Sequence, residues 1–242
     1  MTKPTTTVLI ILAVLFLASP GRLEAQTPSG PESYFNVTFG AQPQRRTVAA
    51  TATATIFDET ALFRADHRIA NGAFFDIAVG RRMLLPGGLT LGFAFSSFSS
   101  DGAAGGTASI PDPLFRGRPA VRALEAGGLK RSEQSYHLQA VWFKPVSRKI
   151  DLAVALGPSL IRVSQQFASG TLDAATQTVT FGPDKESGVR TGLNAGVDFT
   201  YLLKPRYGVG LLVRYTWAKI PLAAADVTAG GFQGGLGLRL QF

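Results

Sequence analysis

The C-terminal stretch FQGGLGLRLQF, residues 232–242, decides the fold. Its apolar side chains fall at even positions, from Phe232 through Leu236, Leu238 and Leu240 to Phe242, with small or polar residues between them. Successive side chains of a β-strand point to opposite faces, so this pattern predicts a strand with one apolar and one polar face. The apolar face must pack against an apolar partner, which could be a soluble core or a lipid bilayer.

The N-terminus favours export. Residues 1–25 contain Lys3, an apolar run at 8–17 and the ending Leu23-Glu24-Ala25. A run of about ten apolar residues is too short to span a bilayer, which needs about 20, so we interpret residues 1–25 as a secretory signal peptide. The mature chain, residues 26–242, is then one β-barrel domain outside the cytoplasm.

Composition narrows the class of protein. The 14 prolines and 27 glycines interrupt every later apolar run, which excludes a helical membrane protein. The chain has no cysteine, so it has no disulfides and no thiolate metal sites. Its net charge of +8 suits an anionic lipid or a phosphorylated glycolipid, and export argues against nucleic acid as a partner.

The period of two recurs along the mature chain. Eight segments show it, at residues 34–42, 73–83, 89–99, 133–144, 150–166, 188–203, 207–217 and 232–242. Their connections alternate between short ones, at 84–88, 145–149 and 204–206, and long ones, at 43–72, 100–132, 167–187 and 218–230. We therefore expect an all-β fold, an eight-stranded antiparallel up-and-down transmembrane β-barrel with short periplasmic turns and long extracellular loops.

The first long connection has a pattern of its own. Thr and Ala alternate over much of residues 47–55, and residues 61–69 alternate again. We interpret both segments as continuations of the first two strands beyond the membrane, with a turn near Phe57-Asp58-Glu59. The barrel should then be taller on its outer side.

The distribution of side-chain size indicates which face meets lipid. The larger apolar residues share one register and the small or polar residues share the other, the reverse of a soluble lipocalin-like barrel. Aromatic residues near the predicted strand ends suggest interfacial girdles, formed by Tyr34, Trp142, Tyr201, Tyr207, Trp217 and Phe242. This asymmetry predicts that lipid surrounds the barrel and that polar groups fill its lumen.

Polar residues on the inward register need partners, because an unpaired charge away from water is costly. We expect a network that fills much of the lumen, formed by Asp76, Asp151, Arg190, Asn194, Asp198, Arg214 and Arg239. An eight-stranded barrel is just wide enough for such side chains to fill it. The alternative is a path that conducts protons or ions through the same groups.

Taken together, the signal peptide, the eight segments, the alternating connections and the ending GLGLRLQF resemble the small bacterial outer-membrane β-barrel proteins of the OmpA-like and OmpW-like porin superfamily. The resemblance covers essentially the whole mature chain and implies a place in the bacterial outer membrane, with lipid and lipopolysaccharide as partners. It also implies that the barrel-assembly machinery recognises the last strand through Phe232, Leu238, Leu240 and Phe242.

Candidate chemistry is sparse. The only histidines are His67 and His137, and Glu133 and Ser135 share a strand face with His137. Residues two apart on a strand are separated by about 6.5–7 Å, whereas a Ser to His hydrogen bond spans about 3 Å, so we interpret this adjacency as structural. We expect no catalytic site, no metal site and no cofactor.

A basic cluster lies in the second long connection and consists of Arg116, Arg118, Arg122, Lys130 and Arg131. Arginine pairs well with phosphate oxygens, so these residues could contact lipopolysaccharide. They could equally be an ordinary solvated loop.

The resulting functional hypothesis is an integral outer-membrane barrel, not an enzyme, with a structural or surface-interaction role and a lumen largely closed by polar residues. We expect a monomer. The alternative is a passive, narrow, porin-like channel for small or hydrophobic solutes.

Overall fold

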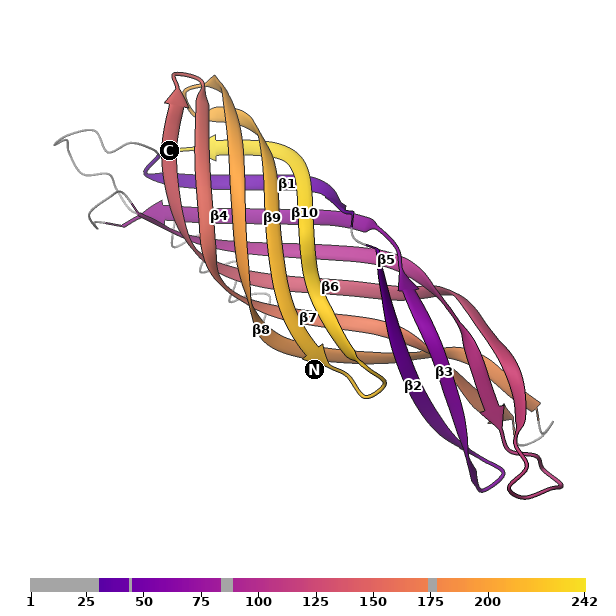
Figure 1. Cartoon of the computed structure of the whole chain (residues 1–242). Helices are drawn as coiled ribbons and strands as arrows, with labels where there is room; N and C mark the ends of the chain where they lie inside the picture. The colour runs from indigo at the N-terminus through magenta and orange to yellow at the C-terminus, as the bar shows by residue number, and fades with distance from the viewer. Residues whose placement is uncertain (1–30, 44, 84–88, 174–177) are drawn as a thin grey trace, which may run out of the picture.

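A computed structural model describes residues 31–43, 45–83, 89–173 and 178–242 (Figure 1). The expected signal peptide at 1–25 and the expected short turn at 84–88 lie outside the described residues. Within the described ranges, no helix is long and apolar enough to cross a membrane.

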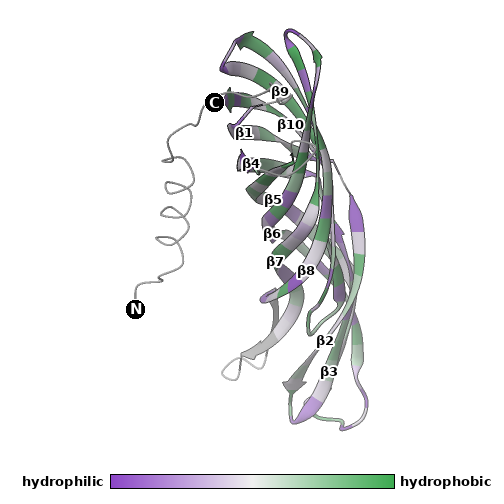
Figure 2. Cartoon of the chain, turned by 90° about the vertical axis from the view of Figure 1, so that its left-hand side faces the viewer, coloured by the Kyte–Doolittle hydropathy of each residue, from purple (hydrophilic) through white to green (hydrophobic). Residues whose placement is uncertain are grey.

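The described residues form ten antiparallel strands. They are β1 (Ser33–Gln42), β2 (Arg46–Ile56), β3 (Glu59–Ile69), β4 (Gly72–Arg82), β5 (Thr90–Ile110), β6 (Ala120–Ser147), β7 (Ile150–Asp173), β8 (Thr178–Lys204), β9 (Tyr207–Pro221) and β10 (Asp226–Gln241). Hydrophobic and hydrophilic bands follow one another along the barrel strands in Figure 2. This alternation is the period of two that the sequence displays.

Eight of these strands form a closed ring in the order β1, β4, β5, β6, β7, β8, β9, β10. The ring closes between the first and last strands, where Phe35 lies opposite Leu240. The N–H groups of Glu32 and Ser33 donate to the carbonyl oxygen of Phe242 at 2.8 and 3.0 Å. The predicted eight-stranded up-and-down barrel is therefore confirmed, and each predicted segment falls on one strand of the ring, although several of these strands are longer than predicted.

Strands β2 and β3 form a hairpin beyond the ring, at the lower right of Figure 1. Phe57 and Asp58 make its turn with φ values of 52° and 59°, as a two-residue turn between right-twisted strands requires. β4 pairs with the inner half of β5 and β3 with the outer half, so the hairpin continues the first two barrel strands outward. We call residues 45–69, 101–130, 161–190 and 218–229 the extension and the remainder of the ring the barrel.

The prediction of long loops was wrong for most of three connections. Residues 100–132, 167–187 and 218–230 lie largely in strands that run from the barrel into the extension. Between β5 and β6 only residues 111–119 lie outside strands. The outer part of β5 consists mainly of Ala, Gly, Ser and Thr, so its two faces differ too little in hydrophobicity for the period of two to show clearly.

The outer surface of the barrel is an apolar band. On β9 the outward side chains from Tyr207 to Trp217 are all large and apolar or aromatic, and all are exposed. Ten residues span about 33 Å along a strand, and a tilt of about 40° reduces this to a height of about 25 Å. That height matches the hydrocarbon thickness that a transmembrane barrel must cover.

The extension reverses this arrangement. On β7, Leu156 and Leu160 face outward in the barrel, whereas Ile161, Val163 and Phe167 are buried inside the extension. Two apolar clusters fill its interior. One contains Ile56, Phe63, Leu124 and Leu129, and the other contains Ile161, Val163, Phe167, Ile220 and Val227. The same strand thus changes which of its faces is apolar as it leaves the barrel.

Candidate functional site

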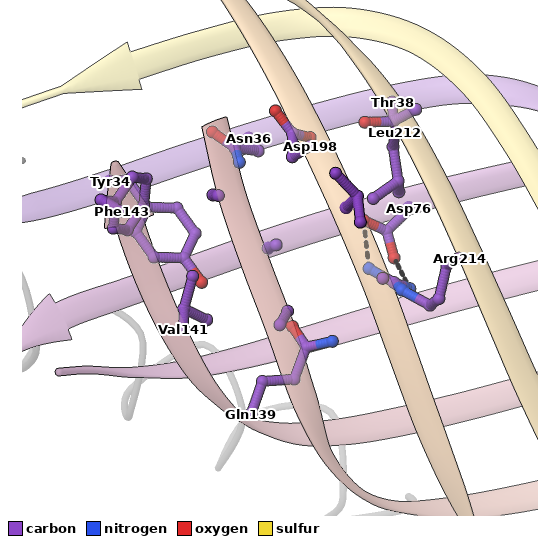
Figure 3. Close-up of a pocket in the computed structure, with 15 residues that line it drawn as sticks. Tyr34, Asn36, Thr38, Asp76, Gln139, Val141, Phe143, Asp198, Leu212 and Arg214 are labelled. Atoms are coloured by element: carbon purple, nitrogen blue, oxygen red, sulfur yellow. Dashed lines mark hydrogen bonds and ion pairs between the residues drawn. The ribbon is translucent and has the colours of Figure 1, made fainter. Parts of the chain in front are cut away.

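An ion pair between Asp76 and Arg214 crosses the lumen (Figure 3). The Arg214 guanidinium donates to the two carboxylate oxygens of Asp76 at 2.6 and 3.3 Å, and both side chains are almost fully buried. The two residues come from β4 and β9, which are not neighbours in the ring. The pair therefore ties opposite parts of the wall together through the lumen.

A second ion pair joins Asp198 of β8 to Arg239 of β10. Arg239 donates from Nε at 2.9 Å and from Nη2 at 2.6 Å, so the contact is bidentate. Gly210 on β9 makes room for this guanidinium, because a Cβ there would lie 2.5 Å from Arg239 Nε. Bidentate Arg to carboxylate contacts are among the strongest hydrogen bonds in proteins.

Farther along the lumen, neutral side chains form a chain of hydrogen bonds. The Asn194 amide donates to Ser159 Oγ at 2.9 Å and to the carbonyl of Gly157, and it accepts from Gln139. His137 is fully buried, with Nδ1 at 2.7 Å from Ser159 Oγ and Nε2 at 3.0 Å from Ser96 Oγ. The lumen is thus occupied across β5, β6, β7 and β8.

Tyr34 belongs to the lumen and not to an aromatic girdle, so the prediction for this residue was wrong. Its side chain is only 4% exposed and meets the edge of Phe143, with ring centroids 5.4 Å apart (Figure 3). It lies on the inward register of β1, and Gly80 and Gly92 leave the space for its ring. Trp142, Tyr201, Tyr207, Trp217 and Phe242 do face outward.

Very little free volume remains among these groups. The lumen cavity bounded by Tyr34, Asp76, Asp198 and Arg214 measures about 40 Å³. One water molecule needs roughly 10–15 Å³ on this scale, so the cavity holds a few waters and no solute.

A polar junction lies where the lumen meets the extension. Arg131 is buried and donates to Glu133 at 2.8 Å, to Gln165 and to the Thr228 carbonyl at 2.7 Å. Glu133 in turn accepts from the Gly230 N–H at 2.7 Å. The prediction that Arg131 could contact lipopolysaccharide was wrong, because this residue lies on the inward register of β6 and is enclosed.

The same junction receives a second guanidinium from the hairpin. Arg46 donates to the carbonyl oxygens of Thr228 and Gly230 at 2.6 and 2.7 Å, and Gln42 donates to Gly230 at 2.9 Å. Gly230 has a φ of 78°, so its backbone takes the left-handed conformation that glycine adopts at little cost. Sequence reasoning missed this junction, although residues 131, 133, 135, 137 and 139 of β6 form an unbroken inward run of polar side chains.

Above the junction, His67 borders the apolar interior of the extension. Its ring meets the edge of Phe167 at 5.0 Å between centroids. Burial lowers the pKa of His67 from its ordinary value, and the negative charge of Asp66 acts in the opposite direction. The imidazole is therefore neutral at pH 7.

The remaining predicted lumen residues differ in placement. Asp151 accepts from Gln241 at 3.1 Å near the end of the barrel opposite the extension. Arg190 is exposed on the outer part of β8, beyond the residues that pair with β9. Its assignment to the lumen was therefore wrong. The expected assembly signal faces outward: Phe232, Leu238 and Leu240 lie on the outward face of β10, and Phe242, directly after the strand, is exposed.

The other basic residues lie on the outside of the extension. Arg116 and Arg118 are in the loop between β5 and β6, and Arg122 and Lys130 are exposed on β6. Glu59 of the hairpin binds this loop by accepting from the Gly117 N–H at 3.1 Å and pairing with Arg116 at 3.3 Å. The loop is thereby joined to the hairpin turn at the distal end of the molecule.

The described residues contain no group of three or more His, Cys, Asp or Glu side chains that could hold a metal ion. Ser135 does not bond His137, whose partners Ser96 and Ser159 come from the two neighbouring strands. That imidazole and its hydroxyl partners are enclosed within the wall and the lumen, so they can orient one another but cannot reach a substrate from bulk water.

Several solved structures are similar to this chain. Neisserial surface protein A is 13% identical, covering 87% of this chain and 97% of its own, with a TM-score of 0.47. The outer membrane protein OprG from Pseudomonas aeruginosa is 10% identical, with coverages of 90% and 99% and a TM-score of 0.46. The attachment invasion locus protein of Yersinia pestis is 11% identical, with coverages of 86% and 99% and a TM-score of 0.39.

These solved structures are small outer-membrane β-barrels, the class that the sequence resembles. At such identities and TM-scores the likeness assigns no function. No protein-family model and no curated protein matches the sequence.

Proposed function

We propose that the protein is an integral outer-membrane barrel that does not conduct and that acts through its extension on the outer side. The observation that carries this proposal is that the interior is closed at two levels. Two buried ion pairs fill the barrel, and an apolar core fills the extension above it.

The apolar band supports the membrane placement. Side chains such as Leu211 and Val213 face outward at the middle of the band, where a soluble protein would expose them to water. Short turns at residues 148–149 and 205–206 lie at the end of the barrel opposite the extension, as periplasmic turns do in outer-membrane barrels.

Opening the lumen would require both ion pairs to separate. Removing one partner of a buried pair costs about 3–5 kcal/mol, because the other charge is left without compensation. A water path would also have to cross the apolar clusters of the extension, whose side chains offer it no hydrogen bonds. These two barriers favour a closed barrel over a passive channel.

The distal loop supports a surface-interaction role. Leu114 and Phe115 are 83% and 59% exposed, and Arg118 and Arg122 lie close to them in the sequence. The loop is ordered, since the Asp112 carboxylate accepts from the N–H groups of Leu114 and Phe115 at 2.8 and 3.1 Å. Two adjacent large apolar side chains at the distal end, beside exposed arginines, support a role of this loop in recognition.

Conductance in planar lipid bilayers tests the proposal. The purified full chain should show no steady openings across a range of voltages. The double variant Asp76→Ala with Arg214→Ala, which empties only the centre of the lumen, should also stay closed, because the Asp198–Arg239 pair and the apolar core of the extension remain. Steady wild-type openings that a lumen-blocking label abolishes would contradict the closed barrel and support the narrow channel instead.

A further inference from the structure

A cleft opens on the outside of the molecule where the barrel meets the extension. It measures about 660 Å³, and its polar lining comes from Arg45, Arg46, Thr47, Arg68, Asn71 and Asp101. It exists because β1 ends at Gln42 before β2 begins at Arg46, and β3 ends at Ile69 before β4 begins at Gly72. β5 runs past both breaks, pairing with β4 before them and with β3 beyond them (Figure 1). The cleft lies beside it.

The charge of the cleft is positive, with three guanidinium groups and the Asp101 carboxylate. Arg46 is held at the inner wall by the carbonyl oxygens of Thr228 and Gly230. Arg45 and Arg68 are exposed, and within the described part of the chain no hydrogen bond or ion pair engages either side chain. Two guanidinium groups are therefore available to an anion.

The cleft also lies at a defined depth. Phe39 and Phe75 are paired on the outward face of β1 and β4, with ring centroids 4.9 Å apart, and Ala41 and Ala73 form the next outward pair. Arg45 follows six residues after Phe39, which is at most about 20 Å along the chain at about 3.3 Å per residue, and a strand tilt of about 40° reduces this to a height of about 15 Å. Lipid headgroups occupy the layer just outside the hydrocarbon core, which is this level.

We propose that the cleft binds the phosphorylated sugar headgroup of a lipid in the surrounding outer leaflet, a site that rests on the proposed membrane placement. Arg45 and Arg68 donate paired N–H groups to the phosphate oxygens. The side-chain oxygens of Asn71 and Asp101 accept hydrogen bonds from the sugar hydroxyls. The Asn71 amide can also donate to them. The volume lies within the range of ordinary ligand sites, about 300–1,000 Å³.

The distal basic residues make a matched control. Arg116 and Arg118 carry the same charge but lie beyond the end of β5, whose outer part from Ser99 to Ile110 spans about 35 Å of strand. A phosphate at the bilayer surface cannot reach them. Losing two arginines there changes the net charge of the protein by the same amount without changing the cleft.

The experiment measures binding of bisphosphorylated lipid A to the full chain in neutral detergent micelles, by competition with a fluorescent lipid A. Arg45→Gln with Arg68→Gln should weaken binding at least about tenfold, because two charge-assisted contacts are lost. Asp101→Asn should strengthen it, since the cleft then loses its opposing charge. Arg116→Gln with Arg118→Gln should leave the affinity unchanged, and dephosphorylated lipid A should compete poorly.

Equal binding by the wild type and the Arg45/Arg68 variant overturns the proposal, as does equal weakening by the distal variant. Inorganic phosphate that competes as well as lipid A would overturn the headgroup assignment in favour of a free anion. Retention of the heat-dependent gel shift shows that each variant is folded, and Asp101→Asn tests the site if the double variant loses that shift. Failure of the membrane placement would show separately, as protein that stays in solution without detergent.

Discussion

The barrel and the extension are built from the same strands, but the apolar face of a strand points outward in the barrel and inward in the extension. In the barrel part of β7, Leu156 and Leu160 point out and Ser159 points in, whereas in its extension part Ile161 and Val163 point in and Arg162 points out. β9 does the same between Trp217, which is exposed, and Ile220, which is buried. No helix or separate domain is needed to change the environment of the chain.

This difference shows that the solvent outside determines which face of a strand is apolar. Lipid accepts Leu211 on the outside of the barrel, so the inside is left to polar groups that must pair with one another. Water surrounds Thr53 and Arg64 on the outside of the extension, so its inside must be apolar. The barrel therefore depends on buried ion pairs, and the extension depends on hydrophobic packing.

The largest expected effect comes from breaking the central ion pair of the barrel. Asp76→Ala leaves Arg214 buried without its carboxylate, which should lower the free energy of unfolding by about 4 kcal/mol. Urea unfolding in detergent, followed by the gel shift, measures this.

The matched control removes both charges. Asp76→Leu combined with Arg214→Met should recover most of the lost stability, because an apolar pair of similar volume is often as stable as a buried ion pair. A loss of less than about 1 kcal/mol in Asp76→Ala would show that water already solvates the lumen.

A smaller effect, and one confined to the extension, is expected from Phe63→Ala. Phe63 is buried in the cluster that also holds Ile56 and Leu124, so the cavity left by its ring should cost about 3 kcal/mol. Faster hydrogen exchange in β2 and β3, with an unchanged gel shift of the barrel, is the expected result. Phe39→Ala, on the lipid-facing side of β1, should leave exchange in the extension as in the wild type.

An arginine substituted on the outer surface should cost more stability in the barrel than in the extension. Leu211→Arg places a charge near the middle of the apolar band and should cost at least about 2 kcal/mol in lipid. Thr53→Arg, on the outer face of the hairpin, should change stability by no more than about 0.5 kcal/mol. Similar costs for the two substitutions would mean that both regions face the same solvent.

The smallest effect is a pH dependence of the extension. An unfolded histidine takes up a proton as the pH falls through about 6.5, but buried His67 has a lowered pKa and stays neutral until lower pH. The unfolded state then binds more protons, so the extension should lose stability as the pH falls from 7 toward 5, by no more than about 1.4 kcal/mol per pH unit. His67→Gln should remove this slope in hydrogen exchange of β3, and a slope that persists would assign it to another group.

The sequence predicts the barrel well because its two faces differ strongly in size and polarity. The terminal strand and β9 show an unbroken period of two, and the hairpin turn at Phe57 and Asp58 follows from the alternation on either side of it. The outer part of β5 was predicted as a loop because Ala, Gly, Ser and Thr give little contrast between its faces. In β7 the apolar residues Leu160 and Ile161 are adjacent, because the apolar side chains point outward up to Leu160 and inward from Ile161. A search for one uniform period of two misses this change.

The lumen was predictable in composition but not in pairing. Sequence register places Asp76, Asp198, Arg214 and Arg239 inside, but which carboxylate meets which guanidinium depends on strand order and tilt around the ring. His137 illustrates the same limit, because its partners lie on neighbouring strands about 5 Å away and not two residues along its own strand. The cleft at Arg45 and Arg68 depends on two strand breaks at one level, which no local pattern indicates.

Depth measurements along β7 test the central claim most directly. The chain has no cysteine, so single cysteines at Leu156, Leu160, Arg162 and Gln166 can each carry a spin label in a lipid bilayer. The account predicts that collisions with lipid-soluble oxygen dominate at positions 156 and 160, and that collisions with a water-soluble nickel complex dominate at 162 and 166. Water-phase collisions at all four positions would contradict it.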